Sequence, residues 1–540
     1  MQTLKEFLSS SSSPPINHSY DLLPLEEINQ NTMSNVQDEK IDSGSLEAGS
    51  ESANHSLHAQ PTTDHGRKRN PFRSTFTQAT ILGICSFLAP GLWGAMSSTG
   101  GGGTQSISLV NAANSSTFCL MVVTALLTPA MIHLTNVRWT LAFGALGYAP
   151  YAAGLYTYRK YGTSASWFVV LGAVLCGISA GVFWASEGAI ILSYPERKKQ
   201  GIYTSYWLMF RVMGQMVGGA INLGLNANNG QAGSLSTNTF LVFVVLQCIG
   251  PFVALLISLP HQVQRKDGTP VVLKLNPTLK SELKAMWVAI TAKKVLLLLP
   301  LIWQTTFSEA VIFSINGTYF SVRSRALASF LGAVVAASAC YILGFILDNH
   351  KWSLNGRARY AFLSIYAMQF AWWGWSIYTT HDYSKSSPTH DWSEGSAWSP
   401  GFAMLLMLQI GFNLMYEYTY WLVGATSEQP GEIVRLAGVI RSVESAGQAV
   451  SYGINSTSWP FYAVCSLNLG FTFLGVIFAW PVVRKTGILS DGTYLYQPPI
   501  YADEEEREAI KREVADEAAV VGTAKEGNEI KKVDEITSAH

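Results

Sequence analysis

Five ionisable residues lie inside long apolar stretches of the chain: Glu187, Arg211, Glu309, Glu417 and Glu444. A charged side chain at membrane depth costs roughly 2.5–3.5 kcal/mol on insertion scales, so it normally faces a partner, the interior of a helix bundle or a water-filled cavity. Two interpretations follow, a structural ion pair that fixes helix packing and the lining of a translocation pathway. We favour the second and expect all five side chains to line that pathway.

The types of these residues suggest ion coupling. Carboxylates at membrane depth can take up and release a proton, so Glu309 or Glu417 is a candidate coupling residue. Arg211 is expected to pair with Glu187. Arg441 lies three residues before Glu444, a spacing that lets the two side chains pair on one helix and act as structural glue. The histidines fall in tails or near the ends of apolar stretches, so a histidine proton relay is not expected.

Aromatic residues crowd the same stretches. Most are expected to pack in the core or to form interface belts. A subset, Trp93, Trp184, Trp303 and Tyr416, is predicted to form the walls of an apolar substrate pocket.

Other chemistry is not indicated. No nucleophile with a base, metal-ligand spacing or nucleotide fingerprint stands out, so we expect neither an enzyme nor a cofactor or metal. The run Gly100–Gly103 lacks the following Gly-Lys-Ser/Thr of a phosphate loop and is interpreted as a flexible turn. The net charge of +0 gives no indication of nucleic-acid binding.

Composition identifies the elements that must hold these residues. The chain has 540 residues, of which 48% are hydrophobic and 13% charged. Such a composition, with long apolar runs, predicts an all-α membrane protein. Twelve membrane-spanning helices are predicted, at about 74–97, 107–133, 138–158, 166–192, 201–225, 238–259, 296–319, 325–347, 359–379, 400–422, 433–455 and 459–483.

The spacing of the predicted helices divides the chain into five parts. They are a disordered N-terminal tail (1–71), a six-helix half (72–260), a linker (261–295), a second six-helix half (296–486) and a charged C-terminal tail (487–540). Most lysines and arginines outside the helices fall on the side of the tails and the linker. The positive-inside rule therefore predicts that both tails and the linker are cytosolic. Two sequons, at Asn316 and Asn455, then lie at the outward ends of helices and are candidate glycosylation sites.

A short internal repeat supports two matched halves. Gly214–Asn222 (GQMVGGAIN) echoes Gly447–Asn455 (GQAVSYGIN), each in the fifth predicted helix of its half. This alignment sets Arg211 opposite Glu444. Many transporters consist of two like halves around a central binding site, and the repeat lies where that architecture requires it.

Several segments resemble known patterns. Gly344–Asp348 followed by Arg357 and Arg359 resembles the gating loop of the major facilitator superfamily, which implies a cytosolic gate formed by Asp348, Arg357 and Arg359. Segments in both halves resemble the uncoordinated-93 family, particularly its fungal branch: Pro90–Trp93, Phe183–Gly188, Tyr420–Gly424, Arg435–Gly438 and Ser445–Gly447. The likeness covers about residues 72–485. Family members often carry Gln at the position of Glu187.

Two functions are consistent with this resemblance. The first is a transporter that moves a small molecule by alternating access, with proton coupling as a subsidiary hypothesis. The second is a non-transporting escort or regulatory subunit that binds another membrane protein, because better-known animal members of the family resemble such proteins. Either would reside as a multi-pass protein in the plasma membrane or an endomembrane.

Overall fold

The computed structural model describes residues 70–104, 106–196, 200–228, 230–231, 233–266, 271, 279–347, 349, 351–426, 430–489, 492 and 494–496. Almost all of the two predicted tails lies outside these residues. Within the described residues, the regular structure is helical, and the β-type pairing consists of three isolated bridges.

The first half of the chain contains α2 (Thr75–Ser86), α3 (Leu92–Ser98), α4 (Ile107–Leu134), α5 (Val137–Leu146), α6 (Tyr148–Tyr161), α7 (Ser166–Ser193), α8 (Gln200–Asn226) and α9 (Thr237–Ala254). A π-helical turn, Phe87–Gly91, joins α2 to α3 around Pro90. Proline lacks the amide proton of a regular helical turn, which accounts for the irregularity.

The second half contains α11 (Lys293–Tyr319), α12 (Val322–Leu347), α13 (Leu354–Ser386), α14 (Ser399–Thr426), α15 (Pro430–Asn455) and α16 (Phe461–Val483). A further helix, α10 (Leu279–Thr291), precedes α11. Short 3₁₀ turns complete the fold at Pro71–Arg73, Gly101–Gly103, Gly162–Ala165, Pro260–Gln262 and Trp392–Glu394.

Each of the twelve predicted membrane helices corresponds to one helix or to two consecutive helices of the structure. The first range is α2 followed by α3, and the third is α5 followed by α6. The linker, predicted as 261–295 without an element of its own, instead contains α10. Its sequence Leu279–Thr291 alternates charged and apolar residues with helical spacing, whereas a hydropathy window detects only uniformly apolar segments.

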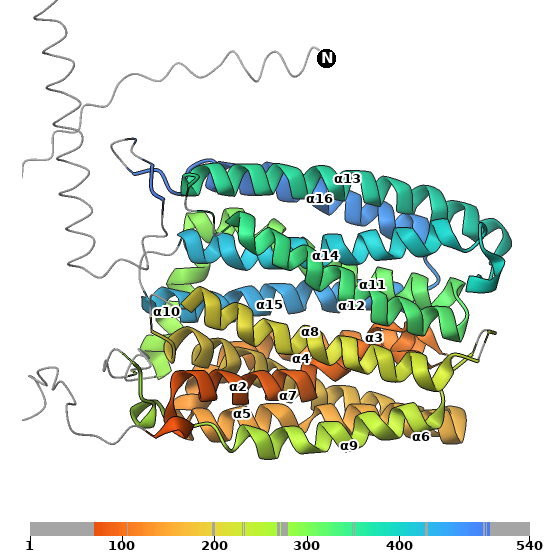
Figure 1. The fold of residues 1–540 in the computed structure, drawn as a ribbon, viewed down its shortest axis with the longest axis horizontal. Coiled ribbons are helices and arrows are strands. Elements are labelled where there is room, and N and C mark those ends of the chain that lie inside the picture. Colours follow the sequence, from red (N-terminus) through yellow and green to blue (C-terminus); the bar gives the residue numbers. More distant parts are fainter. Residues whose placement is uncertain are drawn as a thin grey trace, which may run out of the picture. The chain divides into compact units, whose positions relative to one another are not determined.

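The two halves lie side by side. In Figure 1 the helices of the second half (green to blue, α11 to α16) lie above those of the first half (red to yellow-green). Two buried apolar clusters lie within the second half, and a third, formed mainly by first-half residues, also includes Ala310, Val322, Ala449 and Tyr452 of the second half. The halves meet along two seams, α4 against α15 and α8 against α12.

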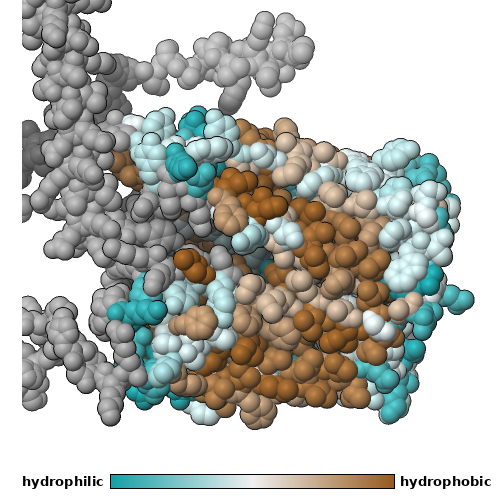
Figure 2. Space-filling view, in the orientation of Figure 1, coloured by the Kyte–Doolittle hydropathy of each residue, from teal (hydrophilic) through white to brown (hydrophobic). Residues whose placement is uncertain are grey.

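The exterior fits a membrane. Figure 2 shows a broad apolar band across the helices, with hydrophilic residues at the ends of the bundle. Seven stretches of the described chain are long and apolar enough to span a bilayer: Thr75–Ser98, Ile107–Ile132, Val137–Ile191, Thr237–Ala254, Lys293–Tyr319, Val322–Leu347 and Phe461–Val483. The remaining long helices, α8, α13, α14 and α15, carry more polar residues, and three of them supply residues to the interior described below.

Close backbone contacts explain the glycines of the repeat. A Cβ on Gly214 of α8 would lie 2.7 Å from the Phe87 carbonyl oxygen and 2.8 Å from the Gly91 Cα. A Cβ on Gly447 of α15 would lie 2.7 Å from the Trp303 carbonyl oxygen. In each half, therefore, the glycine lets the fifth helix approach the backbone of the first helix of the same half.

Candidate functional site: a central cavity between the two halves

A cavity lies between the halves. Its first-half walls come from α3, α4, α6, α7 and α8, and its second-half walls from α11, α14 and α15. Its polar wall contains Arg211, Gln215, Glu309, Arg441 and Gln448.

The repeat supplies the two glutamines of this wall. Gln215 and Gln448 follow the paired glycines Gly214 and Gly447, and both line the cavity. The residues placed opposite each other by the repeat, Arg211 and Glu444, also lie at this centre. Arg211 lines the cavity directly, and Glu444 contacts the cavity residue Arg441.

Arg441 organises a polar network on α15 and α11. Its Nη1 donates to the Glu444 carboxylate at 3.2 Å, and the Tyr420 hydroxyl donates to the same carboxylate at 3.1 Å. Arg441 Nη2 lies 3.5 Å from Gln448 Oε1, and Gln448 Nε2 donates to Glu309 at 2.5 Å. Gln448 therefore bridges Arg441 and Glu309.

Arg211 has different surroundings. Its guanidinium lies over two aromatic rings, 5.2 Å from the centre of Tyr416 and 5.8 Å from that of Trp184. The Arg441 guanidinium also lies over the Trp184 ring, 4.5 Å from the ring centre. Within the described residues, no carboxylate lies within ion-pair distance of Arg211. The expected pair of Arg211 with Glu187 is therefore not formed in this conformation.

Glu187 is fully buried in the first half and does not line the cavity. Its Oε1 accepts a hydrogen bond from Ser86, whose hydroxyl in turn accepts one from the Trp207 indole at 2.6 Å. Glu417 on α14 interacts with Cys340 of α12 and also lies outside the cavity wall. The prediction that all five charged residues line one pathway is therefore corrected for this cavity, since Arg211 and Glu309 line it, whereas Glu187, Glu417 and Glu444 do not.

Three of the four predicted pocket aromatics, Trp93, Trp184 and Tyr416, line the cavity. Phe118, Tyr148 and Phe412 join them. The fourth, Trp303, is not part of the wall. Its ring centre lies 6.5 Å from those of Phe307 and Phe471, with which it forms an aromatic cluster between α11 and α16.

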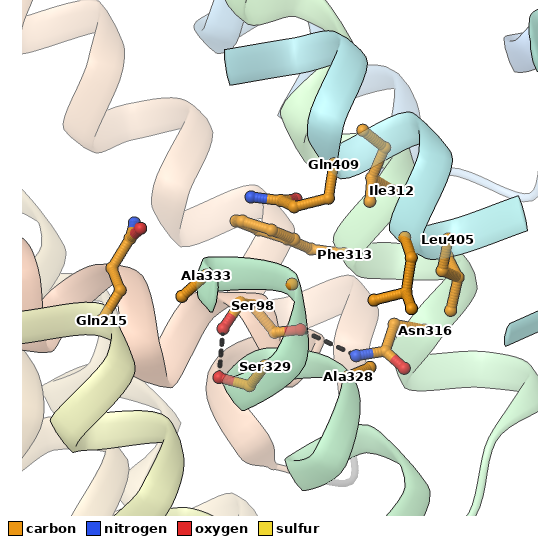
Figure 3. Close-up of a pocket in the computed structure, with 12 residues that line it drawn as sticks. Ser98, Gln215, Ile312, Phe313, Asn316, Ala328, Ser329, Ala333, Leu405 and Gln409 are labelled. Carbon is orange, nitrogen blue, oxygen red and sulfur yellow. Dashed lines mark hydrogen bonds between the residues drawn. The ribbon is translucent and has the colours of Figure 1, made fainter. Parts of the chain in front are cut away.

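A second pocket, here called the Gln409 pocket, adjoins the central cavity. It has an empty volume of about 410 Å³ and is shown in Figure 3. Gln215 lines both pockets and therefore marks their junction. The Gln409 pocket is lined by α3, α8, α11, α12 and α14, and its polar residues Ser98, Gln215, Asn316, Ser329 and Gln409 are neutral.

Beyond the Gln409 pocket, one end of the bundle is closed by hydrogen bonds between the halves. We call it the Arg325 end. Arg325 of α12 is buried and donates to three first-half carbonyls, Thr99 at 2.6 Å, Gly100 at 2.9 Å and Gly233 at 2.9 Å. Ser98 and Ser329 share a hydrogen bond of 2.5 Å (Figure 3).

Further bonds complete this closure. Asn111 of α4 donates to Ser314 at 2.9 Å and to the Asn455 carbonyl at 3.0 Å. Gly100 has φ +78°, and a Cβ there would lie 2.3 Å from the Gly317 Cα. The glycine run 100–103 thus serves a tight contact between the halves in addition to the predicted turn.

The predicted cytosolic gate is only partly visible. Asp348 lies outside the described residues. Arg357 donates to the carbonyls of Leu347 and Tyr496, and Arg359 donates to the Arg484 carbonyl at 2.7 Å. The carbonyls of Leu347 and Arg484 belong to the second half, and that of Tyr496 belongs to the described start of the C-terminal tail. In this conformation the two arginines therefore tie together segments of their own half and the start of that tail.

The two candidate glycosylation sites are also corrected. The Asn316 side chain is 3% exposed and donates to the Ser98 carbonyl at 2.8 Å, between the halves. The Asn455 side chain is 8% exposed and donates to the Ser451 carbonyl at 2.8 Å. Hydropathy placed both at outward helix ends, but both side chains turn into the bundle, where a glycan has no space.

Several functional candidates were absent from the prediction. Gln215 and Gln448 are the glutamines of the repeat, but neither carries a charge that marks it as a site residue in the sequence. Arg441 was assigned to structural glue, yet its side chain also forms part of the cavity wall. Arg325, the first residue of the predicted helix 325–347, was not singled out, because a sequence does not reveal that an arginine near a helix end turns inward.

Comparison with known proteins places this architecture in a class. The fold resembles the xylose transporter XylE of E. coli, with a TM-score of 0.54 at 12% identity, over 75% of this chain and 99% of that one. A structure of a D-xylose-proton symporter gives a TM-score of 0.54 at 15% identity, over 78% and 99% of the two chains. The predicted class, an all-α membrane protein with the major facilitator fold, is therefore confirmed.

The sequence places the chain in a family within that class. The family described as "Ion channel regulatory protein UNC-93" matches residues 112–346. A protein of Aspergillus versicolor named "Notoamide biosynthesis cluster protein O'" is 41% identical over 426 residues, 78% of this chain and 92% of that protein. An UNC93-like protein of Schizosaccharomyces pombe is 26% identical over 79% and 86% of the two chains. The chain belongs to the UNC-93 family, as predicted.

Proposed function

We propose that this protein is a secondary transporter that moves a small organic molecule across a membrane by alternating access to the central cavity. In this account the two halves rock about the cavity, and the Arg325 end and the opposite end open in turn. Arg211, Glu309 and Glu444 act at the cavity. Glu187 and Glu417 do not line the cavity, but they lie on α7 and α14, two helices that form its wall and would move with it.

One observation carries this proposal most directly. Arg211 and Glu309 line a cavity between the two halves, and a separate set of hydrogen bonds closes one end of the bundle. Intramembrane charges that line a cavity are costly to maintain and are typical of substrate or ion pathways. A rigid scaffold would be more stable with apolar side chains at these positions.

Proton coupling through Glu309 is part of the proposal. Its carboxyl group accepts a hydrogen bond from the neutral Gln448 amide, whereas the Glu444 carboxylate is bound directly to Arg441. A proton can therefore be exchanged at Glu309 without breaking an ion pair. Arg211 and Arg441 are the charged groups of the cavity wall that face it.

The charge pattern of the loops supports a cytosolic location for both tails in this proposal. The Arg325 end then faces away from the cytosol. A plasma membrane and an endomembrane location are both consistent with that orientation.

The test uses a transporter that can be locked. Ser98→Cys/Ser329→Cys replaces two side chains that share a hydrogen bond, so an oxidant should join them and hold the Arg325 end closed. The double variant is reconstituted in vesicles with a pH gradient and incubated with a metabolite extract. Mass spectrometry then compares the vesicle contents before and after oxidation.

We expect at least one metabolite to accumulate in reduced vesicles, to be lost on oxidation and to return with reductant. Glu309→Gln should abolish the response to the pH gradient. Glu394→Gln, which changes a half-exposed acid on a loop, is the matched control and should leave accumulation intact. Accumulation that is the same before and after the disulfide forms would refute alternating access through this cavity.

A second candidate, a regulatory or escort subunit, is favoured by the description of the family as an ion channel regulator. It predicts a membrane-protein partner that copurifies in a fixed ratio and whose binding survives the locked disulfide. The transporter predicts that activity needs no partner protein. Reconstitution of the purified chain alone therefore separates the two.

A further inference from the structure

The two arginines of the central cavity differ in how their charges are compensated. Arg441 is bound to Glu444 directly and is connected to Glu309 through Gln448. Arg211 has aromatic neighbours, and its Nε is buried without a hydrogen-bond partner. Within the described residues, Arg211 is thus the cavity cation that lacks a carboxylate.

None of the acids near the centre lies within ion-pair distance of Arg211 in the part of the chain that the structure describes. Glu309 lines the same cavity, where its carboxyl group accepts a hydrogen bond from Gln448, and Glu417 interacts with Cys340. Glu187 is bound to Ser86 inside the first half, and Glu444 is bound to Arg441 and Tyr420. A guanidinium that lies over aromatic rings keeps its in-plane N–H groups available at its edge. Planar anions such as carboxylates bind this edge in a bidentate manner.

The aromatic residues of the cavity wall indicate which kind of molecule carries the anionic group. Trp93, Phe118, Trp184, Phe412 and Tyr416 line the same cavity, together with Met121. Aromatic walls of this kind contact flat apolar groups over a large area, and few polar groups are needed to orient them. A small inorganic anion would leave these walls unused.

From this arrangement, we propose that Arg211 is the substrate-binding cation and that the cargo is an aromatic organic anion whose carboxylate pairs with Arg211. This inference rests on the proposed transport function and names its substrate class. The aromatic part lies against Trp93 and Trp184, and the adjoining Gln409 pocket can accept a neutral extension of the molecule past Gln215.

Binding to the full-length protein in detergent tests this inference without transport. The probes are naphthalene-1-acetate, its neutral amide naphthalene-1-acetamide, and the cationic 1-naphthylmethylamine. Calorimetry and thermal unfolding report affinity and stabilisation. The acid should bind and raise Tm, whereas the amide should bind at least about tenfold more weakly, because a hydrogen bond to a charged group is lost.

Three variants make the assignment specific. Arg211→Gln should weaken binding of the acid about 10- to 100-fold and leave the amide unchanged. Arg211→Lys keeps the charge but loses the planar fork, so it should give an intermediate affinity. Lys160→Gln removes an exposed cation at the end of α6 and is the matched control, with unchanged binding.

Each outcome decides the matter. Equal affinity for acid and amide, preference for the amine, or no binding by any probe overturns the anion assignment. So does an Arg211→Gln protein that keeps its Tm without ligand and still binds the acid normally. None of these results affects the outcome of the transport assay with the Ser98→Cys/Ser329→Cys disulfide. The assignment of an anionic substrate can therefore fail while the transport proposal stands.

Discussion

The buried pair of Arg441 and Glu444 gives a prediction whose magnitude can be worked out from contacts. The Glu444 side chain is 0% exposed and that of Arg441 is 8% exposed. Glu444→Gln keeps the shape and an oxygen that Tyr420 can still bind. It removes the charge that balances Arg441. Removing one partner of a buried ion pair lowers the free energy of unfolding by about 3–5 kcal/mol. Because Glu444→Gln retains an oxygen for Tyr420, its loss should lie near the lower end of this range.

The variant Arg441→Gln should lower the free energy of unfolding less than Glu444→Gln does. Arg441→Gln leaves an unpaired carboxyl group, which can be relieved by taking up a proton. An arginine keeps its charge at any accessible pH and has no such relief. The double variant removes both charges. Its loss of unfolding free energy should therefore be smaller, by at least about 1.5 kcal/mol, than the sum of the losses in the two single variants.

The assay is equilibrium unfolding of the full chain in mixed micelles, followed by tryptophan fluorescence, for the wild type, the two single variants and the double variant. Glu394→Gln on the loop is the control, and its effect should stay within about 0.5 kcal/mol. Additive losses, or a larger loss for Arg441→Gln than for Glu444→Gln, would refute the assignment of Glu444 as the counter-charge of Arg441.

Three further predictions concern the Arg325 end and the helix contacts. Arg325→Met removes three hydrogen bonds between the halves, so cysteine labelling at this end should become faster, and unchanged rates would exclude Arg325 as a latch. Arg323 donates to Asp391 and holds the pKa of that carboxyl well below its usual range. The bond therefore stabilises the fold at neutral pH, and this stabilisation should be lost as the pH falls below about 4. Unfolding curves of Asp391→Asn should lack this contribution to the pH dependence of stability. Gly214→Val forces a clash with Gly91 and should lower Tm in thermal unfolding, whereas an unchanged Tm would refute the close contact.

Much of the fold could be predicted from the sequence because a membrane requires long apolar helices. Hydropathy located the twelve helices, most of them to within about four residues, although α13 (Leu354–Ser386) extends well beyond the predicted 359–379 at both ends and α9 ends five residues before the predicted 259. Pro90 and the Leu146–Tyr148 junction break two of them internally, and α10 is amphipathic rather than apolar. Hydropathy sums composition over a window, so it detects neither kinks nor one-sided helices.

The site was predicted less completely, since orientation around a helix axis is weakly encoded. Glu187 and Arg211 both stood out as charges in apolar helices, yet one faces Ser86 and the other the cavity. The repeat carried more information about the cavity than charge did. It placed Gln215 and Gln448 at equivalent positions, and both line the wall because the adjoining glycines bring α8 and α15 close to the first helix of each half.

The central claim is that the halves move relative to each other about the cavity. Distances between spin labels test it, in a background without the six native cysteines. One pair, at the exposed Tyr161 and Lys385, reports on the Arg325 end, and a second, at the exposed Trp139 and Trp352, reports on the opposite end. We predict two populations for each pair in lipid, which shift in opposite directions between acidic and alkaline pH. A single, unchanged distance for both pairs would contradict alternating access.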